Sequence, residues 1–227
     1  MERLYYIPLW FVKYSIGLEL IFAIVTLLIA IFAFKIYNLT AQRQLKLFSL
    51  GFFATALSYI IWFTLNSFAL ARLNDQTSML LIDQTSDIVN LAAYGHVILY
   101  LTGLAILVYT TLKSESLRTL TLLIAMSIIP IFVTCNTALL FNVIAAIYLA
   151  YLVIHYAAEY KEKRIQNTLY ILTAFILLLT GTIELLFSTG HYLNFVIAHI
   201  CILGSYLLLL ASLARIYLSN GAKKKQT

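Results

Sequence analysis

Residues 16–34 read IGLELIFAIVTLLIAIFAF, and Glu19 is the one charged residue among them. A transmembrane helix needs about 20 mostly apolar residues, and no proline interrupts this run. The rest of the chain has the same character, since 63% of its 227 residues are hydrophobic, only 11% are charged and the mean hydropathy is +0.94. Soluble domains have about 25% charged residues. The sequence therefore predicts an integral membrane protein.

Seven stretches are interpreted as membrane-spanning helices because they are mostly apolar and, with one short exception, long enough to cross a bilayer. They cover residues 10–36, 47–71, 88–112, 119–133, 137–160, 168–187 and 192–219. The fourth is the weakest of the seven because it is short and carries Pro130 near its end, where a helix bends or stops. We expect one all-α domain over residues 1–227, a seven-transmembrane-helix bundle, followed within that range by a basic tail at 220–227.

The longest polar connection, 74–87, repeats the sequence DQTS at 75–78 and 83–86 around the apolar residues 79–82. This pattern predicts a half-helix at the membrane interface, with Thr85 or Ser86 capping the third spanning helix. An outer lid is the alternative interpretation.

The basic residues predict the orientation of the bundle, because cytoplasmic loops carry an excess of lysine and arginine. With the N-terminus outside, 12 of the 15 basic residues fall at the cytoplasmic ends of the helices and three fall outside. The three are Arg3, Lys13 and Arg72. We therefore expect a multi-pass protein of the cell membrane with its C-terminus in the cytoplasm. The net charge of +6 suits anionic lipid headgroups rather than nucleic acid.

Polar residues inside the predicted spans are the best indication of function, since they are costly in a bilayer and usually face the bundle interior. Most of them fall in the outer half: Glu19, Asn66, His96, Asn142, Glu184 and His199. We interpret Glu19, Asn66, Asn142 and Glu184 as candidates for a substrate or proton path. Replacement of Glu184 by glutamine is expected to keep the fold and to alter that function.

His96 and His199 lie at similar depth, about 12 Å and 10 Å from the outer ends of the third and seventh helices. Two imidazoles at one depth could ligate haem b or a metal ion from both sides, so these residues are the candidate cofactor ligands. The identity of any cofactor stays open, because simple hydrogen bonding within the bundle explains the same residues. We expect the two side chains to face each other across the third and seventh helices.

Three classes of function stay open. The leading one is binding of a small ligand or cofactor inside the membrane, by a sensor or a redox-linked subunit. The second is small-solute or proton-coupled transport, which a parallel repeat of three helices, a linker helix and three helices would favour. The third is a structural accessory subunit, with membrane-protein partners or a second copy of the chain. Residues 192–219 contain no lysine, which excludes covalently bound retinal, and no motif of a catalytic family is present.

Overall fold

The computed structural model describes residues 9–74, 80–112, 116–188 and 192–224. They form seven helices: α1 (Leu9–Thr40), α2 (Arg43–Asn74), α3 (Leu80–Thr111), α4 (Leu117–Val133), α5 (Thr137–Lys163), α6 (Gln166–Phe187) and α7 (Tyr192–Lys224). The described residues contain no strand, which confirms the all-helical prediction. A helix pairs its backbone polar groups internally, so it is the structure that such apolar runs can adopt in lipid.

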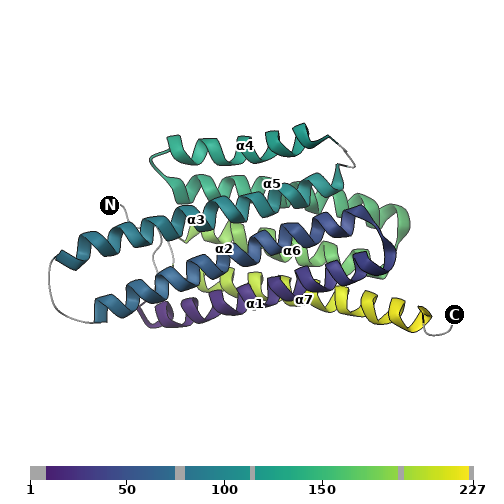
Figure 1. The fold of residues 1–227 in the computed structure, drawn as a ribbon, viewed down its shortest axis with the longest axis horizontal. Coiled ribbons are helices and arrows are strands. Elements are labelled where there is room, and N and C mark those ends of the chain that lie inside the picture. The colour runs from purple at the N-terminus through teal and green to yellow at the C-terminus, as the bar shows by residue number, and fades with distance from the viewer. Residues whose placement is uncertain (1–8, 75–79, 113–115, 189–191, 225–227) are drawn as a thin grey trace.

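Six of the seven helices are long and apolar enough to cross a membrane, and α4 is a shorter apolar helix. Successive helices run in opposite directions, so that α1 begins and α7 ends at opposite ends of the bundle (Figure 1). The connections between α1 and α2, and between α5 and α6, are two residues long. Ala41 and Arg164 make these turns with positive φ angles of 55° and 49°. Such short connections hold each pair of helices antiparallel and adjacent.

The six long helices close into a ring. The order of contact is α1, α2, α3, α5, α6, α7 and back to α1, while α4 packs outside the ring against α3 and α5 (Figure 1). If α1 is exchanged with α5, α2 with α6 and α3 with α7, the same order of neighbours around the ring results. The neighbour relations of the bundle therefore have the two-fold pattern expected of a repeat of three helices with a linker.

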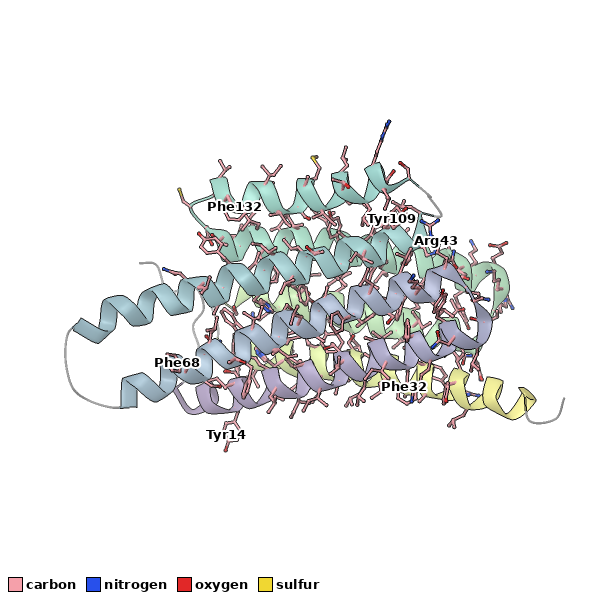
Figure 2. All side chains as sticks on the ribbon, viewed as in Figure 1. Tyr14, Phe32, Arg43, Phe68, Tyr109 and Phe132 are labelled. Carbon is pink, nitrogen blue, oxygen red and sulfur yellow. The ribbon has the colours of Figure 1, made fainter. Side chains whose placement is uncertain are left out.

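Side chains fill the interior of the ring, while α1 residues such as Tyr14 point away from it (Figure 2). The core contains large, fully buried side chains from α1, α2, α3 and α7, including Phe22, Phe52, Leu104 and Tyr206. Many other leucine, isoleucine and phenylalanine side chains are exposed on the outside of the bundle. An apolar outer surface is the surface that contacts lipid in a membrane protein.

Close approach of neighbouring helices depends on glycine. A Cβ atom added to Gly103 of α3 would lie 2.7 Å from the Gly51 carbonyl oxygen of α2. A Cβ atom added to Gly181 of α6 would lie 3.0 Å from the Ala198 carbonyl oxygen of α7. Small residues at such crossings let helix backbones pack closely where lipid provides no hydrophobic driving force for association.

One local expectation is wrong. The segment 80–86 belongs to α3, so Thr85 and Ser86 lie inside the helix and do not cap it. No proline or glycine occurs in 80–90, so the helix continues without interruption into the polar segment. Residues 75–79 of the repeated motif lie outside the described residues. At the C-terminus α7 continues to Lys224, so the first part of the predicted tail is helical.

Candidate functional site

Glu19 of α1 is buried at the contact with α2. Its side chain is 8% exposed, and its Oε1 atom accepts a hydrogen bond of 2.6 Å from Nε1 of Trp62. The Asn66 side chain lies on the same side of α2, one turn beyond Trp62, and its amide group interacts with the carboxyl group. Residues four apart share a helix face. The spacing of Trp62 and Asn66 therefore presents both polar groups to α1.

His96 of α3 also packs against Trp62, with ring centroids 5.2 Å apart. The ring centroid of its imidazole lies 5.4 Å from that of Tyr59, 5.6 Å from that of Tyr100 and 5.8 Å from that of Phe141. Trp62 thus contacts two titratable side chains that come from different helices. The structure brings together three of the predicted residues, Glu19, Asn66 and His96, around an indole.

Glu19 and His96 each have a buried polar atom that has no hydrogen-bond partner among the described residues. These atoms are Oε2 of Glu19 and Nδ1 of His96. The other ring nitrogen of His96 interacts with the backbone carbonyl of Ser58, a hydrogen-bond acceptor. In neutral imidazole only one nitrogen carries a proton, so Nδ1 is then an acceptor. Buried polar groups are nearly always hydrogen-bonded in proteins, so two such atoms on residues that both contact Trp62 call for an explanation.

A layer of tyrosine hydroxyl groups lies beside the cluster. The hydroxyl oxygens of Tyr59 and Tyr206 are 3.1 Å apart and share a hydrogen bond. The hydroxyl group of Tyr100 interacts with both. These residues come from α2, α7 and α3, so the layer connects α3 with α7, although the two helices are not neighbours in the ring.

His199 of α7 lies at the edge of the cluster. It is 7% exposed, and its Nδ1 atom is 2.8 Å from the backbone carbonyl oxygen of Phe195. Its ring contacts Phe22 at 5.9 Å, Phe22 contacts Tyr59 at 5.4 Å, and Tyr59 contacts His96. The described ring contacts therefore connect the two predicted cofactor ligands through Phe22 and Tyr59. Ligation of iron by both histidines stays a prediction.

The remaining predicted residues lie elsewhere in the bundle. Asn142 of α5 is buried, and its amide nitrogen donates to the Ala138 carbonyl oxygen at 3.0 Å. Glu184 of α6 is half-buried, and its carboxylate acts electrostatically on the Cys201 thiol of α7. The described residues contain no group of three or more histidine, cysteine, aspartate or glutamate side chains suited to hold a metal ion. The roles proposed for Asn142 and Glu184 stay predictions.

The sequence analysis missed the aromatic part of the site. Trp62, Tyr59 and Asn66 recur at spacings of three and four residues on α2, which places them on one face. Tryptophan in a membrane helix is usually found at the lipid interface. The signal that distinguishes Trp62 from such a residue is the polar Asn66 one turn further along the same face.

Comparison of the chain with protein-family models, with curated proteins and with solved structures gives no match. The chemistry of the site is therefore inferred from its own atoms. A buried carboxyl group, an imidazole and an asparagine amide stand among aromatic rings. This set of groups can bind a polar molecule or hold a proton.

Proposed function

We propose that the chain is a seven-span protein of the cell membrane, with the N-terminus outside and the C-terminus in the cytoplasm. The distribution of lysine and arginine supports this orientation. The length of α4, 17 residues, corresponds to about 25 Å, slightly less than the hydrocarbon thickness. Its course antiparallel to α3 and α5 supports a seventh crossing (Figure 1).

We further propose that the bundle binds a small ligand at the cluster of Glu19, Trp62, Asn66 and His96, as a membrane-embedded sensor would. The observation that carries this proposal is the pair of buried, unpartnered polar atoms on Glu19 and His96, the two titratable residues that contact Trp62. Leaving such an atom unpaired costs about 1–3 kcal/mol. A ligand that supplies the missing hydrogen bonds removes this cost, which makes the free energy of binding at this site more favourable.

Native mass spectrometry of the detergent-purified protein, together with its absorption spectrum, tests the proposal. We expect a small molecule to co-purify with the wild-type protein and to be lost from the Glu19→Gln variant. The matched control is Glu159→Gln, since Glu159 lies at the far end of α5 and pairs with Lys163 at 2.8 Å. If no molecule co-purifies and none of the ligands tested below binds, the ligand-binding function is contradicted. A Soret band would instead favour haem.

Transport is the second candidate, and the two-fold pattern of helix contacts favours it. Many transporters consist of repeated units with the substrate site at the interface between them. The tyrosine layer joins α2 and α3 to α7, which belong to different units in this pattern. Solute-dependent proton flux in liposomes, lost in Glu19→Gln and kept in Glu159→Gln, would distinguish a transporter from a sensor.

A further inference from the structure

We propose that the ligand of this cluster is a small organic cation, a protonated primary or secondary amine. This inference rests on the proposed ligand-binding function and adds the chemical class of the ligand. It depends on the hydrogen-bonding character of the two unpartnered atoms, on the rings around them and on the charge of Glu19.

Both unpartnered atoms accept hydrogen bonds. Oε2 of Glu19 accepts when the carboxyl group is ionised, the form that a cation beside it stabilises, and Nδ1 of His96 is the nitrogen that does not face the Ser58 carbonyl. Nε1 of Trp62 is already used by Oε1 of Glu19, and no described donor is bonded to Oε2 or to Nδ1. A ligand that satisfies the cluster must therefore bring N–H or O–H donors, and an ammonium group has two or three N–H bonds to share.

Aromatic rings form the surroundings of these acceptors. The imidazole of His96 is in contact with Tyr59, Trp62, Tyr100 and Phe141. The face of an aromatic ring is electronegative and attracts a cation, most strongly when water is excluded. The same rings offer apolar contact to the carbon skeleton of an amine.

The ionised form of Glu19 would favour a cation over a neutral donor. A buried carboxylate is stabilised when a positive group lies beside it and is strongly disfavoured when alone. Among the side chains that the structure describes, which do not include that of Lys13, no lysine or arginine is bonded to either oxygen of Glu19. An ammonium ligand would supply that positive charge, whereas a carboxylate ligand would be repelled.

Fluorescence of Trp62 gives a direct test, because the chain has only two tryptophans and Trp10→Phe leaves Trp62 as the single reporter. The probes are n-butylammonium and 2-phenylethylammonium, with 1-butanol, 2-phenylethanol, butyrate and 3-phenylpropionate as neutral and anionic counterparts of matched shape. They are titrated into the detergent-purified protein at neutral pH. We expect a saturable change with at least one ammonium probe and none with its counterparts.

Variants locate the response. Glu19→Gln should weaken binding of the ammonium probe by about tenfold or more, since it removes a charge-assisted hydrogen bond. Glu159→Gln should leave the affinity unchanged. If Glu19→Gln does not fold, Glu19→Asp, which keeps the charge and withdraws the carboxylate by one methylene, should still weaken binding. In the Trp62→Phe protein, where Trp10 alone reports, no saturable change is expected.

The outcomes separate this inference from the proposed function. Saturable binding of an alcohol or an acid without binding of either amine would contradict the proposal of an organic-cation ligand but would support a ligand site at this cluster. Equal binding of the amine to the wild-type and Glu19→Gln proteins would also contradict the proposal of an organic-cation ligand. If none of the six probes gives a response, the proposal of an organic-cation ligand is wrong. If mass spectrometry also finds no bound molecule, the proposed ligand-binding function is wrong as well.

Discussion

The indole of Trp62 lies between Glu19 and His96, donating its N–H to the carboxyl group while its ring packs against the imidazole. The three residues come from α2, α1 and α3, which are consecutive in the ring of helices. A single side chain of α2 thus fixes the position of one titratable group on each neighbouring helix.

Replacing Trp62 with phenylalanine should destabilise the protein, because Oε1 of Glu19 then loses its donor inside the bundle. The expected loss is about 1–3 kcal/mol in the free energy of unfolding, measured by denaturant titration in mixed micelles. The control is the double variant Trp62→Phe/Glu19→Met, in which no unpaired carboxyl group is left. Its loss of unfolding free energy should be about 1 kcal/mol smaller than the sum of the losses in the Trp62→Phe and Glu19→Met single variants. Strictly additive effects would mean that the hydrogen bond contributes nothing to stability.

Gly103→Ala should destabilise the contact between α2 and α3. The new methyl group would lie 2.6 Å from Oγ1 of Thr55 and 2.7 Å from the Gly51 carbonyl oxygen, closer than packed atoms can approach. Overpacking of this kind costs about 1–3 kcal/mol. The thermal midpoint in detergent should therefore fall.

Gly17→Ala is the matched control for this substitution. A Cβ atom at Gly17 of α1 meets nothing within 4 Å. Alanine is more favourable than glycine in a helix by about 0.5–1 kcal/mol, so the thermal midpoint should stay or rise. A fall of equal size in both variants would contradict the close crossing of α2 and α3 at Gly103.

Helix α4 should open before the helices of the ring. Among the helices that the structure describes, it contacts α3 and α5 only, and Tyr148 of α5 donates a hydrogen bond of 2.8 Å to the Leu123 carbonyl oxygen of α4. Elements with few packed neighbours exchange their amide hydrogens sooner. Hydrogen–deuterium exchange should be faster in α4 than in α3, and Tyr148→Phe should accelerate it in α4 but not in α7. Equal protection of α4 and α3 would contradict a peripheral position.

The sequence was sufficient to predict the helices but not their neighbours. Apolar runs of sufficient length specify helices in lipid, and the cost of burying Glu19, Asn66 and His96 marked these residues as functional candidates. Which helices touch depends on side-chain fit, such as the absence of a side chain at Gly103, and composition does not encode it. The similar depth of His96 and His199 led to the expectation that they face each other, which stays a prediction, while the described ring contacts connect them through Phe22 and Tyr59.

The number of crossings can be tested at Cys135, an exposed native thiol between the end of α4 and the start of α5. If α4 crosses the membrane, Cys135 lies outside, and an impermeant maleimide should label the Cys201→Ser protein in intact cells. Ser114→Cys in the protein lacking both native cysteines should react only after permeabilisation, and Ser78→Cys should react from outside. If α4 stays on the cytoplasmic face, Cys135 is protected and α5, α6 and α7 are inverted. Glu162→Cys, at the other end of α5, would then be labelled from outside, and this result would contradict seven spans. It would also place Lys161, Lys163 and Arg164 outside, although basic residues are in excess on the cytoplasmic side.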